Sequence, residues 1–159
     1  MQLRLDGIDA PEKAFQGEAQ PLALPARDQL VRLAGFTDVT YGPDDTVTGA
    51  SPARVPAVAV AALVETNGRP VALLLSADPS PRMDGDTVPV TTDLLARSVN
   101  GSLARSGAAY ITVYDSTPPT VRMTFTDLGT HRSRRRARPP TARPGSPSPT
   151  RPRSDQTAR

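Results

Sequence analysis

The stretch VPAVAVAALVETNGRPVALLLSA, residues 55–77, decides the expected fold. Residues 55–65 are almost entirely Val, Ala and Leu, a composition typical of a buried β-strand. A turn signal follows at residues 66–68, and residues 69–77 form a second apolar run. Pro70 lies near the start of that run, where a strand tolerates a missing N–H. The stretch therefore predicts a β-hairpin.

Weaker signals before the hairpin predict two strands and one helix. Residues 2–5 alternate in polarity, and residues 36–41 end at a Gly-Pro pair, so each predicts a strand. Between them, residues 26–33 predict a helix, because Pro25 suits a first helical turn and Gly35 suits a helix end.

The clearest helical signal follows the hairpin, at residues 91–107. Thr92 or Asp93 can cap the start of this helix, and Gly107 can end it. Its apolar residues recur every four positions, at Leu95, Val99 and Leu103. A long helix with one apolar face is expected.

Two segments near the end of the body have less certain patterns. Residues 108–114 predict extended structure or a short helix, and residues 120–125, TVRMTF, predict a strand. Taken with the other elements, this order predicts an α+β protein that is mainly β.

Composition excludes several kinds of site. The chain has no cysteine, which excludes disulfides, thiol catalysis and zinc–thiolate centres. His131 is the single histidine, so no site can use two imidazoles. The sequence lacks both the roughly 18-residue apolar stretch of a membrane span and the charge order of a signal peptide. We expect a product that stays in the cytoplasm, or a secreted one if the true start lies upstream.

Charge divides the chain into an acidic body and a basic tail. Residues 131–159 hold nine Arg and one Asp, whereas residues 1–130 carry a net charge of −5. The tail is rich in Arg and Pro and contains no large apolar side chain, so we expect it to be disordered. Its Arg cluster at residues 132–138 predicts a tether for nucleic acid, with a solvated tail or an out-of-frame product as alternatives.

Three motifs occur in a fixed order along the body. They are LRLDGIDAPE at residues 3–12, NGRPVALLLSA at 67–77 and MDGDTVPVTTDLLARSVNGSLARSGAAY at 83–110. In this order they resemble the motifs of the staphylococcal-nuclease-like (thermonuclease) family. The resemblance implies an OB-fold-type small barrel with flanking helices over residues 1–115. It leaves residues 116–130 as an uncertain extension.

The resemblance also implies that the first strands of the family fold are missing. The family places a hairpin before its first arginine, and that hairpin carries a further aspartate that binds calcium, whereas this chain begins three residues before Arg4. The segment MDGDTV, residues 83–88, has the residue types of that hairpin. Because it follows Arg69, an Asp-Gly turn is favoured there over a displaced metal site.

The implied function is metal-dependent hydrolysis of phosphodiester bonds in DNA or RNA, with one calcium ion. Arg4 and Arg69 fall on the family's two phosphate-binding arginines. Asp9 falls on a calcium ligand, and Glu12 falls on the carboxylate assigned as general base. The family often places tyrosines near the nucleotide, which makes Tyr110 and Tyr114 candidates for binding the substrate.

These residue types also suit the chemistry without the family. A guanidinium bridges two oxygens of a phosphodiester, and two of them with a divalent ion stabilise the charge that develops in the transition state. Calcium takes oxygen ligands such as Asp9, and Glu12 can orient or deprotonate water. Each residue taken alone favours an ordinary surface or loop position, and only the three motifs together favour the site. A catalytically impaired domain that binds nucleic acid, or a non-functional gene fragment, is the alternative.

Overall fold

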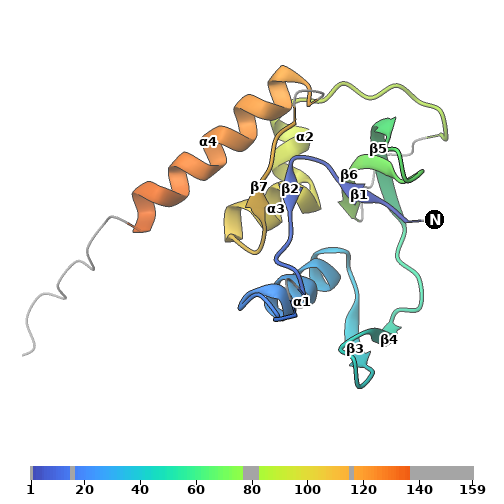
Figure 1. Cartoon of the computed structure of the whole chain (residues 1–159). Helices are drawn as coiled ribbons and strands as arrows, with labels where there is room; N and C mark the ends of the chain where they lie inside the picture. The colour runs from blue at the N-terminus through green and yellow to red at the C-terminus, as the bar shows by residue number, and fades with distance from the viewer. Residues whose placement is uncertain (1, 15–16, 77–82, 115–116, 137–159) are drawn as a thin grey trace, which may run out of the picture.

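A computed structural model describes residues 2–14, 17–76, 83–114 and 117–136, with side chains described as far as Leu128. Figure 1 shows a small group of helices packed beside short β-sheets. The helices are α1 (Ala23–Leu33), α2 (Thr92–Arg97), α3 (Val99–Ser106) and α4 (Pro119–Arg136). The strands are β1 (Arg4–Leu5), β2 (Ile8–Asp9), β3 (Thr37–Tyr41), β4 (Val47–Ser51), β5 (Ala57–Val64), β6 (Pro70–Ser76) and β7 (Tyr110–Ile111).

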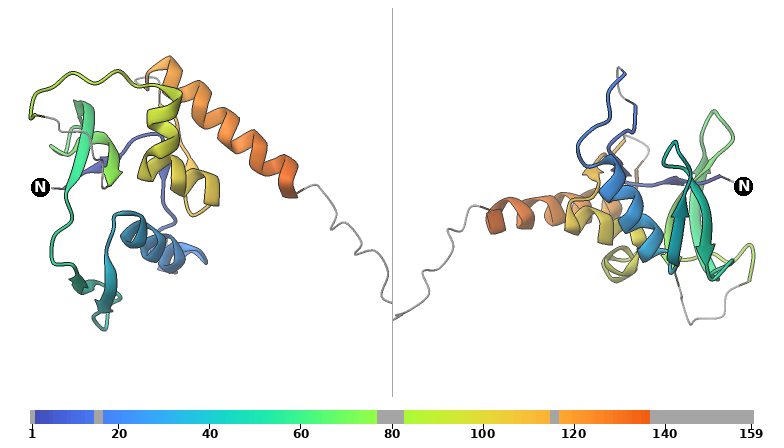
Figure 2. Two further views of the ribbon diagram at one scale, coloured as in Figure 1. Left: turned by 180° about the vertical axis from the view of Figure 1, so that it is seen from behind. Right: turned by 90° about the horizontal axis from the view of Figure 1, so that it is seen from below.

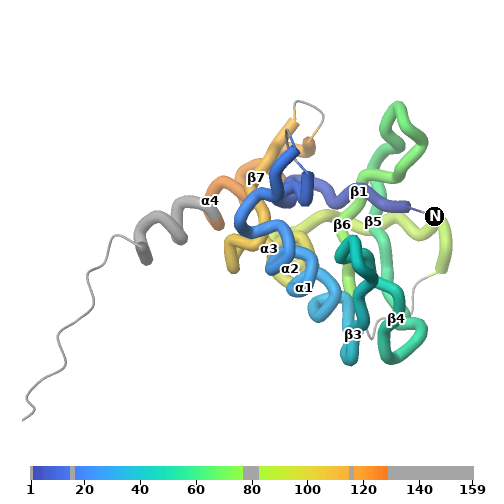
Figure 3. Tube along the Cα trace, turned by 60° about the horizontal axis from the view of Figure 1, so that its bottom comes forward, coloured from blue at the N-terminus to red at the C-terminus, as the bar shows by residue number. Residues whose placement is uncertain are grey.

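The hairpin expected from the sequence forms the centre of the largest sheet. β5 and β6 pair in antiparallel fashion, and β1 pairs in parallel with the other side of β6, so the strand order is β1-β6-β5. The register places Arg4 opposite Val71, close to the hairpin turn. The three strands lie side by side in the tube view of Figure 3. The N-terminal strand is thereby held beside the residues that join β5 to β6.

Strand β5 is not the buried strand that its composition predicts. Val58 and Val60 pack against the core, but Val64 is 64% exposed. β5 is an edge of its sheet, with a hydrogen-bonded neighbour strand on one side only in the described part of the chain. An apolar composition cannot distinguish a central strand from an edge strand, because both contain the same residue types.

The remaining strands form two separate sheets. β2 pairs with β7, and β3 pairs with β4, each in antiparallel fashion. Strands β1, β2 and β7 are each two residues long, so each pairs with its neighbouring strand over a short distance only. The described residues therefore form an α+β structure in which helical residues outnumber strand residues and no sheet closes into a barrel. The α+β class is confirmed, whereas the mainly-β composition and the OB barrel are not.

The long helix expected at residues 91–107 is divided at Ser98. This residue has ψ of 154°, ends α2 and caps α3. Its hydroxyl donates to the Leu95 carbonyl at 2.7 Å and accepts from the Gly101 N–H at 2.9 Å. A Cβ on Gly101 would lie 2.1 Å from the Leu95 carbonyl oxygen, so only glycine permits this approach. The apolar spacing survives the break, because both helices face the same core.

Helix α4 replaces the strand expected at residues 120–125, and that prediction is wrong. Val121 and Phe125 are almost fully buried, which is the spacing of one helical face. Phe125 packs against the turn between β1 and β2, where a Cβ on Gly7 would lie 2.2 Å from the phenyl ring. The helix extends away from the body and continues into the segment expected to be disordered (Figure 2). Residues 137–159 lie outside the described part.

Helix α1 and the β3–β4 hairpin form a second, more exposed part of the molecule. The helix expected at 26–33 and the strand expected at 36–41 are confirmed with small shifts. The Arg27 guanidinium lies over the Tyr41 ring at 3.8 Å from the centroid, and the Tyr41 hydroxyl donates to Asp28 Oδ1 at 2.8 Å. These contacts fasten the hairpin to the helix. Within the described residues, no helix has the length and apolar character required to cross a membrane.

Candidate functional site

Two arginines that are distant in the sequence lie close together beside the β5–β6 turn. Arg4 lies on β1, and Arg69 precedes β6, so the parallel pairing of these strands brings the two residues to the same end of the sheet. Glu65 lies at the other side of the turn, where its N–H donates to the Arg69 carbonyl at 3.0 Å. The turn is closed by a hydrogen bond from the Gly68 N–H to the Glu65 carbonyl at 2.8 Å.

Glu65 joins the two arginines. Arg4 Nη1 donates to Glu65 Oε2 at 3.1 Å, and Arg69 Nε donates to Glu65 Oε1. The Glu65 side chain is 14% exposed, whereas each arginine side chain is 34% exposed. The hydrogen bond from Arg69, followed by that from Arg4, lowers the pKa of Glu65. The carboxylate therefore lies beneath two cations that remain accessible to solvent, and we call these three residues the arginine pair with its bridging glutamate.

Tyr114 holds the other side of Arg4. Arg4 Nη2 donates to the Tyr114 hydroxyl, and the guanidinium carbon lies 5.1 Å from the centre of the ring. The Glu65 hydrogen bond raises the pKa of Arg4, with further contributions from the charges of Tyr114 and Asp9. A cavity of about 180 Å³ adjoins this contact, with Val71 and Pro118 among its apolar lining residues. The guanidinium thus lies between a carboxylate and an aromatic ring.

The two carboxylates expected in the site lie in a more open segment. Asp9 is on β2 opposite Tyr110, and both residues are exposed. Glu12 follows in a loop that is held by backbone contacts, since its N–H donates to Gln20 Oε1 at 2.8 Å and its carbonyl accepts from the Gln20 N–H at 2.9 Å. The negative charge of Asp9 contributes to the raised pKa of Arg4. The Glu12 side chain has no hydrogen bond or ion pair within the described residues.

The structure therefore brings some of the expected site residues together and not others. Arg4, Arg69 and Tyr114 belong to one cluster around Glu65. Tyr110 is 57% exposed on the β2–β7 ribbon and, within the described residues, its side chain forms no hydrogen bond or cation–π interaction with this cluster. Among the described residues, no group of three or more His, Cys, Asp or Glu is placed to hold a metal ion. Asp9 accordingly has no set of neighbouring carboxylates there.

Glu65 is a site residue that the sequence pattern did not identify. The segment ETNGR, residues 65–69, reads as a strand end, a turn and a strand start. In a tight hairpin, the residues that flank the turn face each other across the strands. The sequence could therefore have indicated a contact between the Glu and the Arg at the two ends of this turn. Opposite charges at such positions indicate an ion pair, and the structure adds Arg4 to it from β1.

Asn100 is a second residue that the sequence pattern did not identify. Its side chain is fully buried in α3. Asn100 Nδ2 donates to the carbonyls of Asp6 at 2.9 Å and Ala72 at 3.0 Å. Asn100 Oδ1 accepts from the Leu74 N–H at 3.0 Å. One amide group therefore fastens the helix layer to β6 and to the residue that follows β1, and so fixes the strand that carries Arg4.

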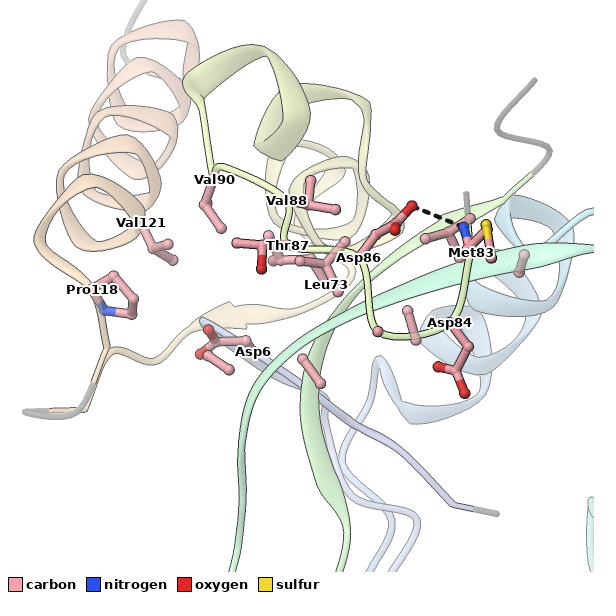
Figure 4. A pocket seen from close by; sticks show the side chains of 17 residues that line it. Asp6, Leu73, Met83, Asp84, Asp86, Thr87, Val88, Val90, Pro118 and Val121 are labelled. Carbon is pink, nitrogen blue, oxygen red and sulfur yellow. Dashed lines mark hydrogen bonds between the residues drawn. The ribbon is translucent and has the colours of Figure 1, made fainter. Parts of the chain in front are cut away.

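A larger cavity of about 740 Å³ lies on the other side of Asp6, between β5 and residues 83–90 (Figure 4). The Met83 N–H donates to Asp86 Oδ2 at 2.9 Å, and the Asp86 N–H donates to the Met83 carbonyl at 3.1 Å. The MDGDTV segment is therefore the turn that its position favours. Burial raises the pKa of the Asp6 carboxyl, which faces this cavity from the end of β1.

Comparison of the chain with protein-family models, with curated proteins and with solved structures gave no match. The resemblance to the thermonuclease family therefore remains a prediction from the three motifs. Function depends on the site rather than on the fold, so the geometry of Arg4, Arg69 and their neighbours is the basis for inferring it.

Proposed function

We propose that the chain binds nucleic acid through its phosphodiester groups and hydrolyses them, with Arg4 and Arg69 as the phosphate-binding pair. The observation that supports this proposal most directly is the shared carboxylate, which keeps two guanidinium groups together at one end of the sheet. Two neighbouring arginines at the surface form a site for a phosphate, because each can offer parallel N–H groups to two oxygens.

The hydrogen-bond count of the pair leaves room for a substrate. A guanidinium has five N–H donors, and Glu65 and Tyr114 use Arg4 Nη1 and Nη2, while Glu65 uses Arg69 Nε. The two terminal nitrogens of Arg69, Nη1 and Nη2, make no hydrogen bond within the described residues. In the proposal these donors bind a non-bridging phosphate oxygen and stabilise the charge that builds on it during attack by water.

The proposal also gives roles to the acidic residues. Glu12 would orient or deprotonate the attacking water, and Asp9 would be a ligand of calcium. Calcium needs six or more oxygen ligands, and the described residues do not surround Asp9 with further carboxylates. These residues do not by themselves fit the ion.

The proposal includes the finer fold assignment. The β1-β6-β5 sheet and its helices would correspond to part of an OB-type barrel, with strands of the family's first hairpin not among the described elements. The basic residues 131–159 would add sequence-independent attraction for the same polyanion. Tyr110 and Tyr114 would contact the nucleotide next to the bound phosphate.

A second function follows from the small number of carboxylates near Asp9. A domain with the arginine pair but no metal site would bind nucleic acid without cleaving it. This alternative shares the phosphate-binding role of Arg4 and differs from the nuclease in the catalytic role of Glu12. The two functions are therefore distinguished by turnover rather than by binding.

Nicking of supercoiled plasmid, with and without calcium, tests the proposal. We expect nicking that falls about 10²–10³-fold in Arg4→Ala, the effect of removing one donor to a developing oxyanion. Arg97→Ala is the matched control, because Arg97 forms an exposed helical ion pair with Asp93 at 2.9 Å. Nicking that is unchanged in Arg4→Ala would contradict the role of the arginine pair. Binding without nicking would favour the second function.

A further inference from the structure

Glu65 is the anionic member of a cationic site, and its burial differs from that of its partners. Its side chain is 14% exposed, less than half the 34% of each arginine. The carboxylate therefore approaches the guanidinium groups from the protein side. An anion in solution would meet the outer edges of Arg4 and Arg69 rather than Glu65.

Two guanidinium groups that point to one place repel each other. The energy of that repulsion grows as solvent is excluded, and long arginine side chains can relieve it by rotating apart. Glu65 opposes this rotation, because Oε2 accepts from Arg4 and Oε1 accepts from Arg69. Each oxygen serves one arginine, so both hydrogen bonds depend on a single side-chain position.

The backbone places the start of the Glu65 side chain. The N–H and carbonyl of Glu65 both take part in the hydrogen bonds that close the β5–β6 turn. Arg4 reaches the carboxylate from β1, whose parallel register with β6 is set by the sheet. Glu65 is consequently the one residue that contacts both arginines in this cluster.

We propose that Glu65 is a positioning residue that aligns Arg4 and Arg69 for a single phosphate group, rather than an internal anion with which the phosphate competes. The inference rests on the proposed function for the identity of the anion, but not for the alignment itself. It assigns a function to a carboxylate that would otherwise weaken an anion site by its charge.

The sign of one affinity change separates alignment from competition. Glu65→Gln removes the negative charge and retains the size of the side chain, so simple electrostatics predicts tighter phosphate binding. The alignment model predicts weaker binding, because the carboxamide replaces one of the two acceptor oxygens with an NH₂ donor that faces a guanidinium, so one of the two hydrogen bonds is lost. We expect affinity to fall about tenfold, the value of one charge-assisted hydrogen bond.

The measurement is an NMR titration of the full chain with thymidylyl-thymidine, which contains one phosphodiester. The Nε–Hε signals of Arg4 and Arg69 report binding at this site and not at the basic tail. The same substitution is made in an Arg69→Ala background, where one arginine remains and no bridge exists. There Glu65→Gln is expected to leave affinity unchanged or to raise it, so the sign of its effect differs between the two backgrounds.

The spectra of the free protein give a second readout. In Glu65→Gln the Nε–Hε signals of Arg4 and Arg69 should shift, whereas that of Arg97 should not, because its partner is Asp93. Unchanged signals of Phe125 establish that the variant is folded, and Glu65→Asp, which keeps the charge on a shorter side chain, should give an intermediate result.

The outcomes distinguish this inference from the proposed function. Tighter binding by Glu65→Gln in the intact chain, or unchanged Arg4 and Arg69 signals in the free variant, would overturn the alignment role. Shifted arginine signals in a protein that does not bind thymidylyl-thymidine would support the alignment and contradict the proposed function.

Discussion

The cationic and acidic halves of the candidate site differ in how their charges are held. Arg4 and Arg69 share Glu65, and Arg4 also contacts Tyr114. Asp9 and Glu12 are exposed, and neither forms an ion pair within the described residues. Like charges converge only where an opposite charge offsets their repulsion. The chain supplies that charge to its arginines, whereas its carboxylates would need an external cation.

The largest expected effect concerns the acidic half. Glu12 is the proposed base, so Glu12→Gln should reduce plasmid nicking by about 10²-fold or more, the usual contribution of general base catalysis.

Asp84→Asn is the control for that experiment, since Asp84 is an exposed aspartate of the 83–90 turn. Equal nicking by Glu12→Gln and the unsubstituted chain would remove the acidic half from the site. The site would then consist of the arginine pair without a catalytic carboxylate.

The next effect concerns the support of the cationic half. Asn100→Ala should lower the free energy of unfolding by about 2–4 kcal/mol, because it removes three hydrogen bonds and leaves the Asp6 carbonyl and the Leu74 N–H without this partner, while the Ala72 carbonyl keeps the Asp6 N–H. Urea denaturation measures the change, and Thr92→Ala on the exposed side of α2 is the control. A loss under about 0.5 kcal/mol, the range of ordinary surface substitutions, would show that the amide is not required.

A smaller effect is expected at the tyrosines. Tyr114→Phe removes the hydroxyl that accepts from Arg4 but retains the ring, so phosphodiester affinity should fall about threefold to tenfold, the value of one hydrogen bond. Tyr110→Phe should leave the Arg4 signal unchanged, because the Tyr110 hydroxyl forms no hydrogen bond with the arginine pair within the described residues. Equal effects of the two substitutions on that signal would contradict the position assigned to Tyr114.

The smallest effect depends on pH. Burial raises the pKa of Asp6 above its ordinary value of 3.8, so the folded state favours the protonated carboxyl. The contribution of this group to stability is full below that ordinary value and is lost as pH rises through the folded pKa. Asp6→Asn should therefore stabilise the chain at pH 7, and by less at pH 3.

Thermal unfolding at the two pH values measures this difference. Asp84→Asn, on the exposed side of the same cavity, should show no such dependence. A destabilising Asp6→Asn at pH 7 would mean that the carboxylate has a favourable partner in the folded state.

The parts of the fold that the sequence predicted are those in which local and tertiary signals agree. The β5–β6 hairpin has two apolar runs and a turn between them, and α1 has Pro25 and Gly35 at its ends. The prediction of a strand at residues 120–125, where α4 forms, was wrong because Val121, Met123 and Phe125 alternate as in a strand. Val121 and Phe125 also have helical spacing. A six-residue window cannot separate the two periods.

The parts of the site that the sequence did not predict are relations between distant residues. Motif positions indicated Arg4 and Arg69, but nothing local indicated that Glu65 would join them. The break at Ser98 was equally hidden, because Leu95, Val99 and Leu103 keep their spacing across it. Such features depend on which backbone groups meet after folding, and a linear pattern does not contain that information.

The close approach of Phe125 to Gly7 has a consequence for how the chain is made. The first strands leave the ribosome early, yet the ring that covers their connecting turn belongs to the last described helix. Residues 2–9 can reach their final packing only after residues 119–128 have been synthesised. Folding of the segment that carries Arg4 is therefore expected to wait until helix α4 has been translated.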